Sequence, residues 1–270
     1  MSLVLFSGVT ALILEGSLIH YPVKFLLALV ALYFTGGSAN GLNQYFEREI
    51  DARMSRTRWK RPLPLQKLTA AQALIFSISI GLIGILTFGF VFNWLTAILS
   101  LGTLIFYGFF YTLWLKPNTH LNIVIGGIAG AMAPVGLWAA ASGSLAWTPM
   151  ILFLIIFFWT PPHFWALALY HKDDYRRAGL PMMPVVKGEE AAARQIFYYA
   201  IFLVGITALL LIVGAGLLYL SVALIIGAVF LHKAYMLLRQ RTPEREMHLF
   251  RFSLVYMFVI LSAIIIDKFV

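Results

Sequence analysis

Long apolar segments separated by short polar ones divide the chain from one end to the other. A membrane-spanning helix needs about 20 mainly apolar residues, and the first segment is short for a span. The pattern predicts an all-α fold, a polytopic membrane helical bundle with nine transmembrane helices in a single domain, residues 1–270. The nine segments lie near residues 2–18, 22–43, 69–90, 94–115, 120–141, 147–170, 196–216, 219–237 and 249–266.

Composition agrees with this pattern. Hydrophobic residues make up 61% of the chain, charged residues 11%, and the mean hydropathy is +0.88, whereas an ordinary soluble domain has about 25% charged residues. The chain has no cysteine, which excludes disulfides and thiolate metal sites. The opening stretch "MSLVLFSGVTALILEG" has no positively charged region and no convincing cleavage site, so we interpret it as a first spanning helix and not a signal peptide.

The net charge of +9 follows the predicted topology. Lys and Arg gather in alternate connections, between residues 48 and 67, at Lys116, between residues 172 and 194, and between residues 239 and 245. Such an asymmetry is typical of cytoplasmic loops. We therefore expect a cytoplasmic N-terminus and an outside C-terminus in a lipid bilayer, and no nucleic-acid partner.

The first long polar segment, "NQYFEREIDARMSRTRWKRPLP", places Asn43, Glu47 and Asp51 every fourth residue, so that on a helix they share one face. Mg²⁺ prefers such oxygen ligands and is often held by one or two carboxylates together with substrate phosphates. Basic residues that follow could bind phosphate oxygens. A solvated loop that only satisfies topology is the alternative. The basic residues are Arg53, Arg56, Arg58, Lys60 and Arg61.

The second long polar segment, "HKDDYRRAGLPMMPVVKGEE", lies on the same predicted membrane face. On its own it resembles a solvated loop, where such residues normally occur. Together with the first segment it could form the other wall of a diphosphate and Mg²⁺ site. Its polar residues are Lys172, Asp173, Asp174, Tyr175, Arg176 and Arg177.

Aromatic rings concentrate inside two spans, in "FYGFFYTLW" and "FFWTPPHFW". The adjacent prolines Pro161 and Pro162 predict a bent helix that lines a cavity, because each removes a backbone hydrogen bond. Ring faces attract cations, although aromatic residues are also common at lipid-facing positions. His163, next to the prolines, is either a substrate contact or proton acceptor, or a packing residue bonded to a neighbouring helix.

These motifs resemble the UbiA-type intramembrane prenyltransferases. The family's first motif is Asn-x-x-x-Asp-x-x-x-Asp at a helix end, and Glu47 stands here in the middle place. The sequences "RPLP", "TPPHFWALA" and "DDYRRAGLPMMPVVKG" are similar to the branch of the family that farnesylates heme. The adjacent pair Asp173 and Asp174 departs from the family's usual Asp-x-x-x-Asp. The family usually begins with a polar segment before the first helix, so we expect that the sequence is truncated.

The resemblance implies Mg²⁺-dependent transfer of a farnesyl group from farnesyl diphosphate to a vinyl group of heme b (protoheme IX), in the cell inner membrane and near its cytoplasmic face. Heme-modifying or terminal oxidase assembly proteins would be downstream partners. The catalytic and metal-binding residues it implies are Asn43, Glu47, Asp51, Asp173 and Asp174, and the substrate-binding residues are Arg53, Arg56, Arg58, Lys172, Tyr175, Arg176 and His163.

Two alternatives remain from the sequence. A prenyltransferase that acts on an aromatic acid in quinone synthesis would use the same diphosphate residues. A small-solute transporter would also have kinked helices and a central polar site, but it predicts ionisable residues near mid-span, whereas here charge collects at one face.

Overall fold

The computed structural model describes all 270 residues, Met1–Val270, and every regular element in it is a helix. Eight helices are long and apolar enough to cross a membrane. Three of them continue into tighter or wider helical turns, at Phe88–Phe92, Phe106–Leu115 and Ala208–Val213. The eight are α2 (Pro22–Phe46), α5 (Ala70–Thr87), α6 (Trp94–Ile105), α8 (Asn122–Ser142), α9 (Trp147–Tyr170), α12 (Glu189–Thr207), α13 (Leu217–Arg239) and α14 (Pro243–Asp267).

The all-helical membrane bundle predicted from the sequence is confirmed, with one difference in the count. The first apolar helix, α1 (Ser2–Glu15), has 14 residues, whereas the eight spans have 21 to 25 residues each when the turns that continue them are included. At 1.5 Å per residue it is about 21 Å long, shorter than the roughly 30 Å hydrocarbon core of a bilayer. The bundle therefore holds nine apolar helices, of which eight have the length of a span.

The last helices begin earlier than the apolar pattern predicts. We expected spans from residues 196 and 249, whereas α12 begins at Glu189 and α14 at Pro243. Thr242 accepts a hydrogen bond from the backbone N–H of Arg245, which caps α14 at its polar end. Such caps start a helix outside the apolar region, where hydropathy carries no signal.

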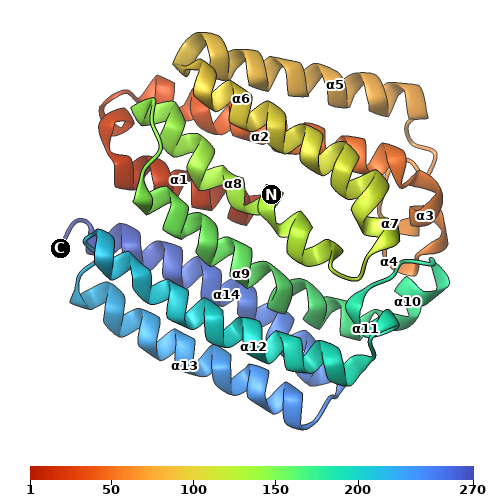
Figure 1. Ribbon diagram of the computed structural model, residues 1–270. Helices are drawn as coiled ribbons and strands as arrows, with labels where there is room; N and C mark the ends of the chain where they lie inside the picture. Colours follow the sequence, from red (N-terminus) through yellow and green to blue (C-terminus); the bar gives the residue numbers. More distant parts are fainter.

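The helices lie side by side and form one bundle (Figure 1). The first half packs through α2 against α5 and through α6 against α8. In the second half α12 and α14 pack on α9, and α13 packs on α12 and α14. The two halves meet where α8 packs on α9, while α1 fills the groove against α8 and α14. The larger hydrophobic cluster crosses this contact, from Ile123 and Ala131 of α8 to Ile155 and Trp165 of α9. A smaller, separate cluster joins α1, α2 and α8.

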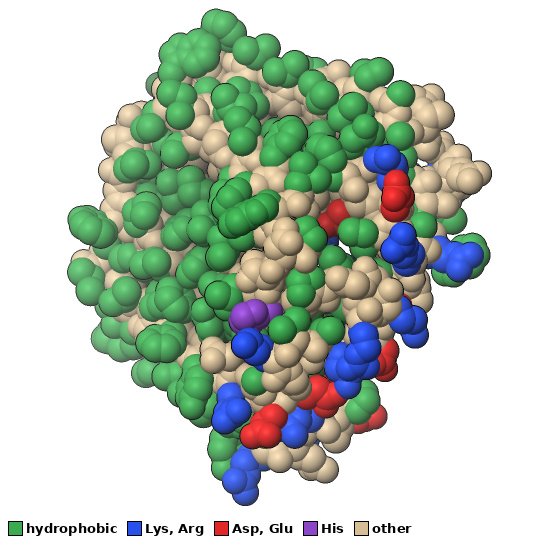
Figure 2. Space-filling model, turned by 45° about the vertical axis from the view of Figure 1, so that its right-hand side comes forward, with side chains coloured by type: hydrophobic (Ala, Val, Ile, Leu, Met, Phe, Trp, Pro, Cys, Tyr) green, Lys and Arg blue, Asp and Glu red, His purple; other side chains and the backbone are tan.

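Much of the outer surface is apolar. Large side chains such as Phe90, Trp147 and Leu217 are more than 70% exposed, and Figure 2 shows hydrophobic side chains over most of the visible face. A soluble monomer rarely exposes contiguous apolar patches of this extent, so this surface fits a protein whose solvent is lipid.

Charged side chains gather at one end of the bundle, which we call the polar end (Figure 2). Five short helices lie there, at the end of the bundle opposite the C-terminus (Figure 1). They bring together the two long polar segments of the sequence. The short helices are α3 (Arg48–Arg53), α4 (Ser55–Arg58), α7 (Lys116–Asn118), α10 (Lys172–Arg177) and α11 (Met183–Val186).

Small residues allow α2 and α5 to pack closely. A methyl group added to Gly84 would lie 2.9 Å from the carbonyl oxygen of Ala31 and 2.8 Å from Cγ2 of Thr35. Close backbone approach at small residues is a common way for membrane helices to associate. This contact holds α2 in place, and the first polar segment continues directly from α2.

We expect Gly84→Ala to destabilise the protein by about 1–3 kcal/mol, the usual cost of overpacking a close contact. Gly102→Ala is the matched control, because Gly102 also lies inside a helix and nothing approaches its added methyl group within 4 Å. Thermal unfolding in detergent should show a lower midpoint for Gly84→Ala and an unchanged or higher one for Gly102→Ala. Equal midpoints would contradict the close packing of α2 on α5.

Candidate active site

Asn43, Glu47 and Asp51 lie on one face at the end of α2. The backbone N–H of Glu47 donates to the carbonyl of Asn43 (2.9 Å), and that of Asp51 donates to the carbonyl of Glu47 (2.8 Å). The helical bonding pattern therefore continues across the junction of α2 and α3. All three side chains are buried, with 2–4% of each residue exposed, so the structure gathers two carboxylates and an amide into one protected spot.

Two basic residues compensate these carboxylates. The Lys116 ammonium, from α7, lies 2.5 Å from Glu47 Oε1. The Arg61 guanidinium, from the segment after α4, hydrogen-bonds to Asp51 and lies 3.6 Å from Glu47 Oε2. Burial raises the pKa of Asp51 above its ordinary value; Arg61 opposes this rise and Glu47 adds to it. Two acids and two bases thus share a site that excludes most solvent.

A hydrogen-bond chain orients the amide of Asn43. The Thr112 hydroxyl donates to the carbonyl of Tyr107 (2.7 Å), and it accepts from Asn43 Nδ2 (3.2 Å). Thr112 reaches a carbonyl five residues earlier because Phe106–Leu115 forms wide, π-helical turns, which often occur at functional sites. Since Nδ2 is engaged by Thr112, Asn43 Oδ1 is left as the oxygen available to a ligand.

Asp174 joins the second polar segment to the first. Its carboxylate accepts from the Ser55 hydroxyl (2.8 Å), from the backbone N–H groups of Ser55 and Arg56 (both 3.1 Å), and from Arg177 (2.8 Å). Burial acts to raise the pKa of Asp174, but the hydrogen bonds from Arg177, Ser55 and Arg56 outweigh it and hold the pKa well below its ordinary value. Asp174 therefore fixes the start of α4.

The other predicted residues of the second segment have different surroundings. Asp173 is exposed and pairs with Arg176 at 2.8 Å, and Lys172 pairs with Glu189 at the start of α12. Tyr175 is buried beside Asp174. The structure thus directs Asp174 and Tyr175 inward, while Asp173 and Arg176 lie on the surface.

Among the predicted basic residues of the first segment, Arg53 and Arg58 are exposed. The Arg58 guanidinium lies over the ring of Trp59, 4.8 Å from its centroid. Arg56 is partly buried, and its Nε atom has no hydrogen-bond partner. Burial lowers the pKa of the nearby His171, and the positive charges of Arg56 and Lys60 lower it further while Asp174 opposes them. The region around Arg56 therefore has a positive potential.

His163 lies deeper, between α9 and α14. Its ring stacks between Trp159 and Phe250, with centroids 4.3 and 4.6 Å away, and its Nδ1 lies 2.7 Å from the Ser253 hydroxyl. That hydroxyl donates to the carbonyl of Phe250 (2.6 Å), so Nδ1 must carry the proton that Ser253 accepts. In the neutral ring, Nε2 then holds the free lone pair.

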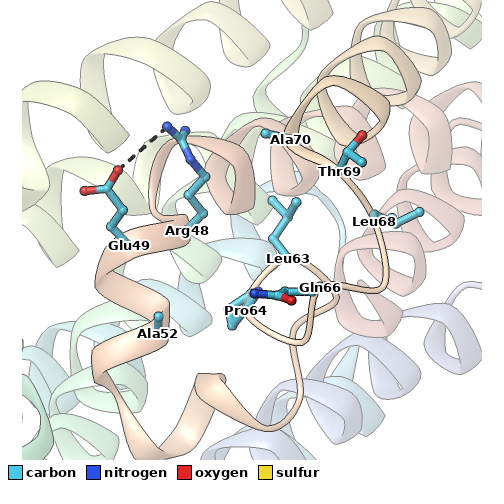
Figure 3. A pocket seen from close by; sticks show the side chains of 9 residues that line it. All are labelled: Arg48, Glu49, Ala52, Leu63, Pro64, Gln66, Leu68, Thr69 and Ala70. Atoms are coloured by element: carbon cyan, nitrogen blue, oxygen red, sulfur yellow. Dashed lines mark ion pairs between the residues drawn. The ribbon is translucent and has the colours of Figure 1, made fainter.

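Two concavities lie at the polar end. One, of about 460 Å³, is on the outer side of α3 and is shown in Figure 3, where Arg48 and Glu49 form an ion pair at 3.8 Å. It contains none of the buried carboxylates. The other, of about 570 Å³, lies between α4, α9 and α14 and is lined by Arg56, Lys60 and Arg61. Arg61 connects this second concavity to Glu47 and Asp51.

The chain matches the UbiA prenyltransferase family over residues 4–260. It belongs to that family. The protein named "Protoheme IX farnesyltransferase" from Rhodopseudomonas palustris (strain HaA2) is 42% identical over 272 residues, which cover 99% of this chain and 86% of the relative. The protein of the same name from Symbiobacterium thermophilum is 45% identical over 245 residues, 90% of this chain and 82% of the relative.

Solved structures with the UbiA fold align with nearly the whole chain. Digeranylgeranylglyceryl phosphate synthase is 19% identical with a TM-score of 0.80, over 98% of this chain and 92% of that one. A UbiA homologue from Archaeoglobus fulgidus bound to GPP and Mg²⁺ is 15% identical with a TM-score of 0.62, over 97% and 96%. These similarities show the fold, and the membrane bundle is that of a UbiA prenyltransferase.

The sequence did not reveal several partners in this UbiA site. We interpreted Lys116 as a marker of topology only, yet it is the nearest cation to Glu47. Thr112 and Ser253 were not singled out, although they orient Asn43 and His163. The position of Lys116, a lone lysine at the end of an aromatic span, was the one feature of the sequence that could have indicated its role. The two hydroxyls gave none, because their partners lie 69 and 90 residues away.

We expect Asp174→Asn to loosen the start of α4 in this prenyltransferase, since hydrogen bonds to a charged group contribute about 1.5–3 kcal/mol. Limited proteolysis in detergent should then cut faster between residues 53 and 69. Asp173→Asn is the matched control, because Asp173 is exposed and pairs only with Arg176, within α10. Equal cleavage in the two variants would show that Asp174 does not hold the segment.

Proposed function

We propose that this UbiA protein transfers a farnesyl group from farnesyl diphosphate to a vinyl group of protoheme IX, in a Mg²⁺-dependent reaction that yields heme O. The observation that carries the proposal is the buried pair Glu47 and Asp51 held between Arg61 and Lys116. The choice of farnesyl diphosphate and heme is supported by the name shared by relatives about 42% identical over nearly the whole chain.

The residues present fit a magnesium ion. Mg²⁺ usually takes one or two carboxylates together with substrate phosphates and water, and the site offers two carboxylates with Asn43 Oδ1 on the same face. Glu47, Asp51 and Asn43 would hold the ion, and because no group of three or more His, Asp or Glu side chains comes together in the chain, substrate phosphates and water would have to complete its ligands. When bound, Mg²⁺ would stabilise the negative charge of the diphosphate. Asp173 and Asp174 remain predicted ligands.

Arg61 and Lys116 are placed to receive the diphosphate. Arginine binds phosphate oxygens through two parallel hydrogen bonds, and lysine contributes a compact charge. When the bond between C1 of the farnesyl chain and the diphosphate oxygen breaks, the electron pair leaves with the diphosphate. Arg61 and Lys116 are already in place to stabilise the negative charge that develops on the leaving diphosphate. Their effect is stronger in a water-poor site than in water.

The allylic cation needs a site without competing nucleophiles. Tyr107 and Tyr111 stack at 5.0 Å on the helix that supplies Lys116, and such rings stabilise a cation through their π faces. The vinyl π electrons form the new C–C bond, and the cation left beside the porphyrin takes up water. His163 Nε2, with its free lone pair, would accept the proton that this water loses.

The remaining substrate roles follow from the sequence. The remaining predicted substrate-binding residues differ in burial: Tyr175 is buried, Arg56 and Lys172 are partly buried, and Arg53, Arg58 and Arg176 are exposed. The positive charge of the polar end supports a cytoplasmic orientation for it. We therefore propose an inner-membrane protein with a cytoplasmic N-terminus, an outside C-terminus and downstream partners that modify heme or assemble a terminal oxidase.

Glu47→Gln and Asp51→Asn should each lower turnover at least about 100-fold, the scale on which loss of one electrostatic contact to a developing charge lowers kcat. The measurement is farnesyl transfer over a Mg²⁺ titration, with thermal unfolding followed in parallel. Glu49→Gln is the matched control, since the Glu49 side chain is 77% exposed on the other side of α3. Full activity of both carboxylate variants would exclude the metal assignment.

Membranes that contain the protein, given Mg²⁺, farnesyl diphosphate and heme b, should yield a heavier and more hydrophobic heme on reversed-phase chromatography. Under the same conditions 4-hydroxybenzoate should stay unmodified, because an aromatic acid needs a basic side chain deep in the cavity for its carboxylate, and the central helices α8 and α9 contain no Lys or Arg. Prenylated hydroxybenzoate with unchanged heme would replace the heme assignment by that of a quinone-pathway prenyltransferase.

A further inference from the structure

The second concavity at the polar end, which we call the basic cleft, has a strongly positive rim. Arg56, Lys60, Arg61 and His171 line it, and no carboxylate does. Arg61 is compensated by Asp51 and Glu47. The guanidinium of Arg56 and the ammonium of Lys60 form no ion pair within 4 Å, and the buried Nε of Arg56 has no hydrogen-bond partner. A buried donor without a partner is costly, so this rim is suited to an anion.

The floor of the basic cleft is apolar. Leu167 from α9 and Met247 and Phe250 from α14 line it, and each is partly exposed. The Phe250 ring stacks on the ring of His163, 4.6 Å away. A small inorganic anion gains nothing from such a floor, whereas a ligand that joins anionic groups to an apolar body fits both surfaces. The prenyl donor also has an anionic end and an apolar body, but its diphosphate is proposed to lie at Arg61 and Lys116, which leaves the basic cleft to the acceptor.

We propose that the basic cleft binds the acceptor porphyrin, with its two carboxylate side chains at Lys60 and Arg56 and its ring plane over Met247 and Phe250. This inference rests on the proposed function, because it identifies where heme b lies relative to the prenyl donor. A protoporphyrin carries both carboxylates on one edge and its vinyl groups away from that edge. Lys60 is exposed, so the carboxylate edge faces outward.

The orientation brings the reacting groups together. Arg61 belongs both to the basic cleft and to the buried carboxylate pair. A porphyrin held outward by Lys60 therefore turns its vinyl groups inward, toward Glu47 and Asp51, where the diphosphate end of the prenyl donor is proposed to lie. His163, directly behind Phe250, is covered on both ring faces and can meet the substrate only through its ring edge.

The test compares Lys60→Gln with Lys67→Gln in the purified full-length chain in detergent. Lys67 is also exposed and lies outside the basic cleft. Binding is followed by the Soret absorbance of heme b and of its dimethyl ester, which lacks the carboxylate charges. We expect Lys60→Gln to weaken heme b about two- to fivefold, the range of one exposed ion pair. Ester binding should stay unchanged, and Lys67→Gln should bind both as the unchanged protein does.

A second ligand and a second variant separate the possible results. Lys60→Gln should bind an unreactive thiodiphosphate analogue of farnesyl diphosphate as tightly as the unchanged protein. Met247→Trp, which fills the floor, should weaken heme b and its ester alike. If Lys60→Gln weakens the analogue and not heme b, the cleft belongs to the donor and the inference is overturned. The inference is also overturned if Lys67→Gln weakens heme b binding as much as Lys60→Gln does. Neither result alters whether the unchanged protein farnesylates heme, which the chromatographic assay decides separately.

Discussion

Two carboxylates buried at the end of a membrane helix are the constraint on which the polar end depends. An unpaired buried charge costs several kcal/mol, so Glu47 and Asp51 require cations close by. Arg61 and Lys116 supply them from two segments that are distant in the sequence. To do so, the segment after α4 must return to α3 and place Arg61 beside Asp51. The helix that ends in α7 must place Lys116 beside Glu47. The four side chains together define the position of the connections around them.

The fold could largely be predicted from the sequence, because apolar length is a strong signal for membrane helices. The segment at residues 147–170 was predicted with the bounds of α9. The early starts of α12 and α14 could not be predicted from hydropathy, since both first turns are polar. The start of α14 also depends on a local cap, the Thr242 side chain. The length of α1 also differed, because Gly16 ends it in a left-handed conformation at φ 96°.

The site was only partly predictable. A four-residue spacing places Asn43, Glu47 and Asp51 on one face of any helix, and the structure gathers them there. Asp173 and Asp174 are equivalent in the sequence, yet one is exposed and the other buried. Adjacent residues of a short helix point in different directions, and the hydrogen bonds from Ser55 and Arg56 to Asp174 decide which one faces inward.

The cap made by Asp174 has a consequence for how this protein can vary. Three of its contacts go to Ser55 and to the backbone of Arg56, and none goes to the Arg56 side chain. A backbone N–H is supplied by any residue except proline. A change of the side chain at position 56 therefore leaves these contacts of Asp174 in place. Substrate preference at the basic cleft and the integrity of the polar end are thus separable traits, which selection or protein engineering can adjust one at a time.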